Sequence, residues 1–124
     1  MPDNEWMDRL IASIDAMDEN KFSEFIAEDG EFRYGSQPAV AGREAVREYV
    51  KAFFSGFKGI SHNVHESRVL DDGQMVFMVG EVSYTRLDDS IVTIPFLNKL
   101  KMDGNLIKEY HVYADPTPVF APAE

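Results

Sequence analysis

The sequence predicts a single α+β domain in which about three N-terminal helices pack on a curved, mostly antiparallel sheet. Two observations predict this fold class: apolar residues recur at helical spacing through the first half, and apolar and polar residues alternate through the second. The length of 124 residues suits one domain with one core. No repeat, linker or low-complexity segment divides the chain, so we expect one domain over residues 1–124.

Two helices are predicted at the start of the chain. Apolar residues at steps of three and four predict an amphipathic helix over residues 5–16. Asp18 is the predicted N-cap of a short second helix, and Asp29-Gly30 then predicts a stop and a turn. The apolar stripe of the first helix comprises Trp6, Leu10, Ile11, Ile14 and Met17, and the second helix turns Phe22, Phe25 and Ile26 inward.

A short strand and the strongest helical pattern follow. Residues 31–34 alternate in polarity, and residues 38–42 form a second extended piece that Pro38 places at a sheet edge. From Arg43 a new apolar stripe predicts a third helix. This stripe comprises Val46, Tyr49, Val50, Phe53, Phe54 and Phe57, and Gly56 and Gly59 end it.

The second half of the chain predicts an antiparallel meander of four strands. The strand-like runs are residues 60–70, 75–86, 91–102 and 106–115. Short polar segments separate them, and two contain the Asp-Gly pair that is typical of hairpins. The tail after Asp115 carries three prolines, so we expect it to be irregular, with Asp115 as a turn or cap residue.

Charge and composition exclude several classes of function. The net charge is −10, with 22 acidic against 12 basic residues, and a phosphate backbone would be repelled. We therefore expect no nucleic-acid partner and no anionic membrane. The chain has no cysteine, which excludes disulfides, thiolate chemistry and Cys-based zinc sites. The acidic, polar start and the lack of a long apolar run predict a cytoplasmic protein.

The order of elements, together with four short motifs, resembles the nuclear-transport-factor-2-like superfamily, in particular its SnoaL-like branch. The motifs are Gly-Arg-Glu-Ala-Val at 42–46, Gly-Glu-Val-Ser-Tyr-Thr at 80–85, Val-Thr-Ile-Pro-Phe at 92–96 and Ile-Lys-Glu-Tyr-His-Val-Tyr-Ala-Asp at 107–115. The resemblance covers roughly residues 5–120. It implies a cystatin-like conical half-barrel, in which the concave sheet face and the helices enclose a cavity. Members include ketosteroid isomerase, limonene-epoxide hydrolase, polyketide cyclases, scytalone dehydratase and non-catalytic binders, so the fold alone does not fix an activity.

Similarity to the epoxide hydrolase, anchored on Gly73, Pro95 and Ile107, indicates which side chains face the cavity. The expected lining is mostly apolar with a few polar groups, as in most ligand pockets. A one-residue bulge would invert the parity of a strand. The inward residues are Phe32, Tyr34, His62, Val64, Met78, Gly80, Val82, Tyr84, Ile94, Phe96, Asn98, Tyr110, Val112 and Ala114.

The usual catalytic acids of these relatives are missing. The Arg and two Asp of the epoxide-hydrolase pattern correspond here to Gly80, Val82 and Val112. The general-base Asp of the isomerase pattern falls near Tyr34, and a tyrosine with a pKa near ~10 is a poor base at neutral pH. Neither of these two mechanisms is expected.

The remaining polar groups resemble those of scytalone dehydratase in kind. His62 is the candidate proton acceptor, Tyr34 a group that polarises a carbonyl or holds a water, and Asn98 an orienting group. Asp15 or Asp18 would supply an acid only if its helix turns it inward. Each of these residues also has a structural alternative: a solvated histidine, or a core tyrosine or asparagine with one hydrogen-bond partner.

Two functions therefore stay open. One is a domain that binds a small lipophilic molecule in a pocket lacking the usual acids. The other is a cofactor-independent isomerase, cyclase or dehydratase acting on a small carbonyl or hydroxy compound through His62 and Tyr34. A subunit whose sheet serves only assembly is a third, weaker option. The residues expected to contact the ligand are Asn98, Tyr110, Tyr84, Phe96, Phe32, Ile94, Val82, Val112 and Met78.

The outer sheet face carries the remaining expectations. His62 and His65 fall on opposite faces and cannot share one ion with Glu66, so we expect no metal and no cofactor. His65 and His111 are expected to face outward. Apolar residues on this face predict that a second copy covers it in a homodimer. They are Phe77, Val79, Leu97 and Tyr113.

Overall fold

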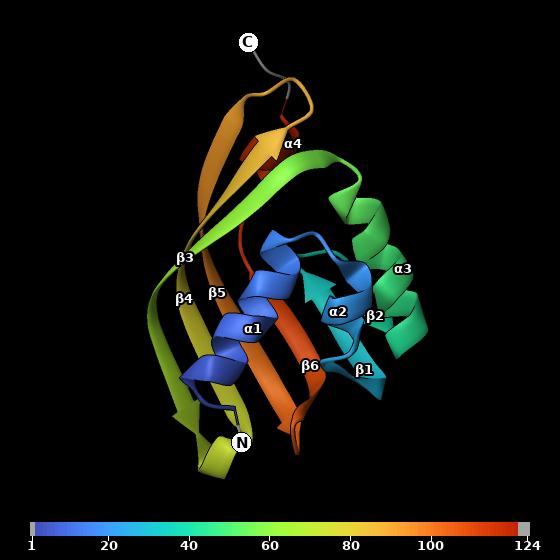
Figure 1. Cartoon of the computed structure of the whole chain (residues 1–124), viewed down its shortest axis with the longest axis vertical. Helices are drawn as coiled ribbons and strands as arrows, with labels where there is room; N and C mark the ends of the chain where they lie inside the picture. Colours follow the sequence, from blue (N-terminus) through green and yellow to red (C-terminus); the bar gives the residue numbers. More distant parts are fainter. Residues whose placement is uncertain (1, 122–124) are drawn as a thin grey trace.

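The computed structural model describes residues 2–121 and places helices on the concave side of one curved, six-stranded sheet (Figure 1). The strand order is β2-β1-β6-β5-β4-β3. The α+β class is confirmed. The helices are α1 (Asn4–Asp15), α2 (Glu19–Ser23), α3 (Arg43–Phe54) and α4 (Thr117–Phe120), with a 3-10 turn, η1, at Asp71–Gly73. The strands are β1 (Ile26–Tyr34), β2 (Val40–Ala41), β3 (Phe57–Leu70), β4 (Met75–Arg86), β5 (Ile91–Asp103) and β6 (Leu106–Tyr113).

The predicted meander is confirmed, because β3, β4, β5 and β6 pair antiparallel in chain order. β1 then joins β6 in parallel, which makes the sheet mixed, and β2 lies at the edge expected from Pro38. The parallel pair is closed through α3, β2 and the meander rather than through a tight turn. Because β1 pairs with β6, the inward side chains of the two strands lie next to each other at the cavity.

Local capping explains where α1 and α2 begin. The Asp3 side chain accepts a hydrogen bond from Trp6 N at 2.9 Å, and the predicted N-cap Asp18 accepts from Asn20 N and Lys21 N at 3.1 and 3.0 Å. α1 ends at Asp15, whose carboxylate lies in the last turn without a basic residue beside it. A negative charge there opposes the helix dipole, so helix stability does not account for it.

Asp29-Gly30 does not form the predicted stop and turn. β1 begins at Ile26, earlier than predicted, and runs through both residues, with an irregular register before Glu31. A Cβ at Gly30 would lie 2.6 Å from Ile26 Cγ2 and 2.8 Å from the Ile107 carbonyl oxygen. The glycine therefore marks a close backbone approach inside the strand, and Ile26 is buried from β1 rather than from α2.

Two further boundaries differ from prediction. α3 ends at Phe54, so Phe57 is buried as the first residue of β3 instead of extending the helical stripe. The tail is not irregular throughout, since residues 117–120 form the short α4, and residues 122–124 lie outside the described part. Asp115 Oδ1 accepts a hydrogen bond from Thr117 N at 3.0 Å, as expected of a turn residue, while Pro116 is the N-cap of α4.

A bulge in β3 changes which side chains face inward. The register shifts between Val64 and Glu66, opposite Gly80. A Cβ at Gly80 would lie 2.0 Å from Asn63 O, so only glycine fits beneath the bulge. Val64 is 37% exposed and lines a groove under α1, so the prediction that it lines the central cavity is wrong.

Candidate functional site

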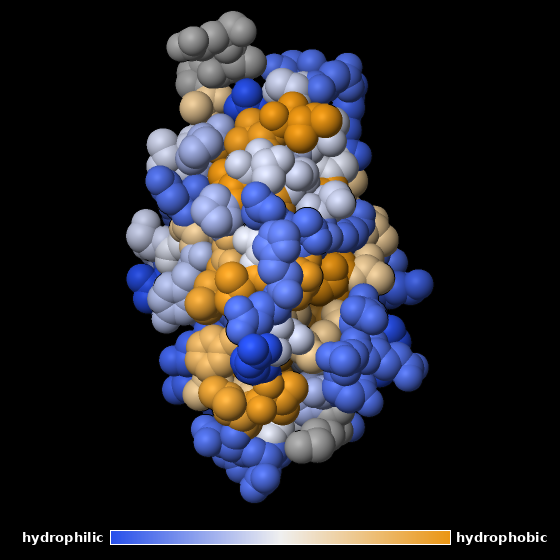
Figure 2. Space-filling view, turned by 90° about the vertical axis from the view of Figure 1, so that its left-hand side faces the viewer, coloured by the Kyte–Doolittle hydropathy of each residue, from blue (hydrophilic) through white to orange (hydrophobic). Residues whose placement is uncertain are grey.

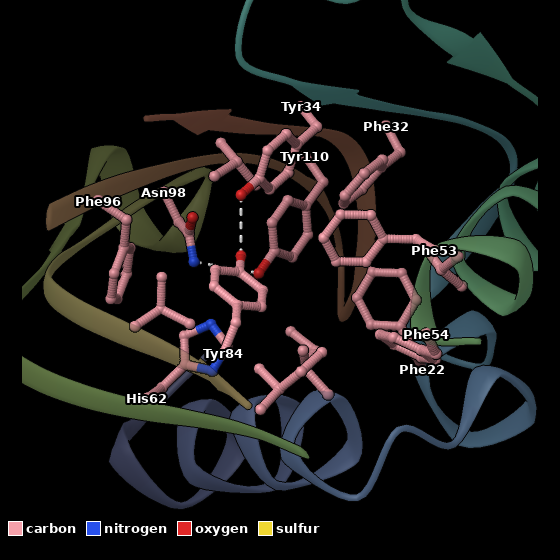
Figure 3. Close-up of a pocket in the computed structure, with 15 residues that line it drawn as sticks. Phe22, Phe32, Tyr34, Phe53, Phe54, His62, Tyr84, Phe96, Asn98 and Tyr110 are labelled. Carbon is pink, nitrogen blue, oxygen red and sulfur yellow. Dashed lines mark hydrogen bonds between the residues drawn. The ribbon is translucent and has the colours of Figure 1, made fainter. Parts of the chain in front are cut away.

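A pocket lies between the concave sheet face and the helices, at the centre of the hydrophobic core (Figure 3). Its free space has a volume of about 40 Å³, enough for a few water molecules. Phenylalanine and tyrosine rings surround that space in Figure 3. The full lining is Ile14, Phe22, Phe32, Tyr34, Val50, Phe53, Phe54, Ile60, His62, Val82, Tyr84, Phe96, Asn98, Tyr110 and Val112.

Most of the predicted site residues line this pocket. Ile94 and Met78 are the exceptions: both are buried on the inner face, but neither lines the cavity. Met78 instead borders the groove of about 290 Å³ under the N-terminal half of α1. The predicted residues that the structure brings together are His62, Tyr34, Asn98, Tyr110, Tyr84, Phe96, Phe32, Val82 and Val112.

Sequence reasoning missed the part of the lining that comes from the helices and from the start of β3. Strand parity assigns faces within the sheet, but it does not show which helical side chains meet those faces. The apolar stripes of the helices indicated which of their side chains are buried, but not which of those reach the cavity. The missed residues are Ile14, Phe22, Val50, Phe53, Phe54 and Ile60.

Asp15 and His62 form the most polar contact at the pocket wall. Asp15 Oδ1 lies 2.5 Å from His62 Nδ1, and Asp15 Oδ2 accepts a hydrogen bond from the backbone N–H of His62 at 3.1 Å. The carboxylate accepts and does not donate when ionised, so it selects the His62 tautomer that carries its proton on Nδ1. The His62 side chain is 9% exposed, its ring packs edge-on against Phe96, and it points into the pocket (Figure 3).

Two tyrosines, Tyr34 of β1 and Tyr84 of β4, meet across the cavity. Their hydroxyl oxygens lie 2.9 Å apart in a buried hydrogen bond (Figure 3). Burial is the largest cause that raises the pKa of each hydroxyl above its ordinary value of 10.0. Both groups therefore stay protonated at neutral pH, and one of the two hydroxyl protons is left to donate elsewhere.

Asn98 and Tyr110 form the second polar pair. Asn98 Nδ2 donates to Tyr110 Oη at 3.1 Å, and both side chains are almost fully buried. Burial also raises the Tyr110 pKa well above its ordinary value. Asn98 Oδ1 has no hydrogen-bond partner among residues 2–121, and the Asn98 side chain extends into the pocket toward Tyr84 (Figure 3). A buried acceptor without a partner is rare in a folded protein and calls for an explanation.

The other histidines lie on the outer face, as predicted. His65 Nε2 lies 2.9 Å from Glu81 Oε1, and the His111 ring stacks on Tyr113 with the centroids 3.8 Å apart. Within residues 2–121, no three His, Asp or Glu side chains gather closely enough to hold a metal ion. No helix in the same part of the chain is long and apolar enough to cross a membrane.

A protein-family model for the SnoaL-like domain matches residues 7–110, and the chain belongs to this family. The nuclear-transport-factor-2-like resemblance is thereby confirmed. No curated protein matches the sequence significantly.

Solved structures agree with the fold at low sequence identity. A hypothetical protein with a ketosteroid isomerase-like fold from Catenulispora acidiphila, in complex with trimethylamine, is 14% identical; the match covers 89% of this chain and 85% of that one, with a TM-score of 0.80. A candidate SnoaL-like polyketide cyclase from Jannaschia sp. CCS1 is 18% identical, with coverage of 96% and 92% and a TM-score of 0.80. TerC, co-crystallized with polyporic acid, is 16% identical, with coverage of 96% and 95% and a TM-score of 0.78.

Proposed function

We propose that the protein is a cofactor-independent acid–base enzyme of the isomerase, cyclase or dehydratase type, acting on a small lipophilic carbonyl or hydroxy compound. The observation that carries the proposal is the Asp15–His62 pair, because it supplies a carboxylate that the strand residues lining the pocket do not provide. Asp15 orients a histidine whose second ring nitrogen faces an apolar cavity. This is the arrangement by which a carboxylate prepares an imidazole to act as a base.

The proposed chemistry is a proton transfer at carbon. His62 Nε2 takes a proton from a carbon next to a carbonyl, and the electron pair of that C–H bond moves onto the carbonyl oxygen. A neutral tyrosine hydroxyl donates a hydrogen bond to the resulting enolate oxygen. His62 then returns the proton to a different atom of the substrate, so that atoms and charge balance without a cofactor. Asp15 stabilises the imidazolium that forms in between.

A binding domain without catalysis is the second candidate, and the small cavity favours it. The free volume of about 40 Å³ admits a substrate only after aromatic rings rotate, and no acidic side chain of residues 2–121 lines the cavity itself. Two of the similar structures, those with trimethylamine and with polyporic acid, contain small molecules, which supports a ligand pocket under either proposal.

Turnover of a panel of hydrophobic ketones and phenols distinguishes the two candidates. His62→Ala is expected to abolish turnover while circular dichroism and thermal unfolding stay close to those of the wild type. His65→Ala is the matched control, because His65 is exposed on the outer face and should leave the rate unchanged. Ligand binding that persists in His62→Ala, with no turnover of any compound by the wild type, would support the binding domain instead.

We also propose that two copies pair through the outer sheet face. Val79 and Tyr113 are 37% and 47% exposed there, and Phe77 and Leu97 are half-buried. Hydrophobic residues gather in several patches around the β3 edge in Figure 2. Light scattering at micromolar concentration is expected to give the mass of a dimer, and Val79→Glu is expected to give a monomer. A monomeric wild type would refute this pairing.

A further inference from the structure

The polar groups at the deep end of the pocket have more hydrogen-bonding capacity than they use. Asn98 Nδ2 donates one N–H to Tyr110 Oη, whereas Asn98 Oδ1 is an acceptor without a partner among residues 2–121. Tyr110 accepts in that bond, so its own hydroxyl proton is free to donate. The deep end therefore offers an open acceptor, and at least one open donor beside it, within a single side-chain pair.

A ligand hydroxyl satisfies both open groups at once. The ligand O–H donates a hydrogen bond to Asn98 Oδ1, while the ligand oxygen accepts a hydrogen bond from the Tyr110 hydroxyl. A ketone or ether oxygen can accept from Tyr110 but leaves the amide oxygen unpartnered, which costs the desolvation of that group. Sites with buried groups of this kind discriminate strongly against analogues that lack the matching hydrogen-bonding group.

The surroundings exclude a charged ligand head. The side chains beside this pair in Figure 3 are aromatic rings, including the neutral hydroxyls of Tyr34 and Tyr84, and Asn98 and Tyr110 are 1% and 2% exposed. Among residues 2–121, no lysine or arginine lines the pocket that could neutralise an anion, and the Asp15 carboxylate at its wall is already engaged by His62. An anion would also face the open carbonyl oxygen of Asn98 and a chain with a net charge of −10.

We infer that Asn98 and Tyr110 select a neutral hydroxyl, an alcohol or a phenol, as the deep-end anchor of a small aromatic or alicyclic ligand. The inference deepens the proposed function, because the same pocket would hold the substrate by its hydroxyl while the imidazole of His62 faces the rest of the molecule. Asn98 acts as a specificity-determining residue here and not as a proton-transfer group.

The test compares three small probes of similar shape: phenol, which donates and accepts, anisole, which only accepts, and toluene, which does neither. Calorimetric titration measures the affinity of each for the wild type and for Asn98→Leu. In the variant, phenol is expected to lose about tenfold in affinity relative to toluene, the equivalent of one buried hydrogen bond. Thermal stability is expected to fall modestly, because the change removes the unpartnered acceptor but also leaves the buried Tyr110 hydroxyl without the hydrogen bond from Asn98.

The wild-type ranking tests the inference even if Asn98→Leu fails to fold. Cyclohexanol is expected to bind more tightly than cyclohexanone, which has the same ring but no donor. Equal or tighter binding of cyclohexanone, or of anisole over phenol, would overturn the inference and indicate that the amide presents its N–H groups instead. Absence of phenol binding overturns it too. These measurements involve no turnover, so their failure is separate from that of the His62 rate test.

Discussion

The carboxylate of Asp15 contacts His62 at both the ring nitrogen and the backbone N–H, joining the last turn of α1 to the middle of β3. The two residues lie 47 positions apart in the sequence. The two-point contact fixes both the position of the strand and the plane of the imidazole. It also explains why a carboxylate occupies a helix terminus that electrostatically disfavours it.

Replacing Asp15 with Asn is therefore expected to lower turnover by about 100-fold or more, within the range of general acid–base catalysis. The amide no longer fixes the His62 tautomer or stabilises its imidazolium form. Steady-state kinetics on the substrate found in the panel would measure the effect, with Asp8→Asn as the control because Asp8 is an exposed carboxylate on the same helix. A rate close to that of the wild type would remove Asp15 from the mechanism.

The buried tyrosines predict a specific response to alkaline pH. Burial raises the pKa of Tyr34, Tyr84 and Tyr110 above the ordinary value of 10.0 that applies in the unfolded chain. Because the folded pKa is the higher one, their contribution to stability is complete below pH 10 and is lost as the pH rises above it. Tyrosinate absorbance measures their ionisation as the pH is raised. The three buried tyrosines should ionise only as circular dichroism reports unfolding; their free ionisation in the folded state would contradict this.

The Tyr34–Tyr84 hydrogen bond is expected to show strong coupling in a double-mutant cycle. Either single change to Phe leaves the other hydroxyl buried without its partner, which costs about 1–3 kcal/mol. The double change removes both hydroxyls and should cost less than the sum of the two single changes. Chemical denaturation of the four proteins measures this coupling. Additive losses would mean that the two hydroxyls do not depend on each other.

Gly80→Ala is expected to destabilise the fold by about 3 kcal/mol, because its Cβ would overlap Asn63 O at 2.0 Å. Gly59→Ala is the matched control in the neighbouring strand, where the nearest atom, Thr85 Oγ1, lies 3.5 Å away. That change should alter stability by less than about 0.5 kcal/mol. Urea unfolding midpoints compare the two variants, and equal midpoints would show that the bulge opposite Gly80 shifts freely.

The fold was largely predictable because its signals are local. The Asp18 cap, the stripe of α3 up to Phe54 and the turns between the four late strands all depend on residues close in sequence. The errors arose where contact with a segment distant in sequence determines the structural role of a residue. Glycine is a common turn residue, and for that reason Gly30 was predicted to end a helix. In the structure its missing side chain instead lets the backbone of Ile107 in β6 approach closely. The parallel pairing of β1 with β6 likewise has no signature in either strand alone.

The candidate site divides in the same way. Alternation along β1, β4, β5 and β6 fixed the parity within each strand, and the resemblance to the epoxide hydrolase indicated which parity faces the cavity. Together they placed Tyr34, Tyr84, Asn98 and Tyr110 on one face. The sequence by itself thus determined the fold class and the strand-borne half of the pocket. Only the tertiary structure decided that Asp15 reaches His62, that helical phenylalanines close the cavity, and that Asn98 Oδ1 is left open. These depend on how the helices are rotated and set against the sheet, and packing between segments distant in sequence determines that geometry.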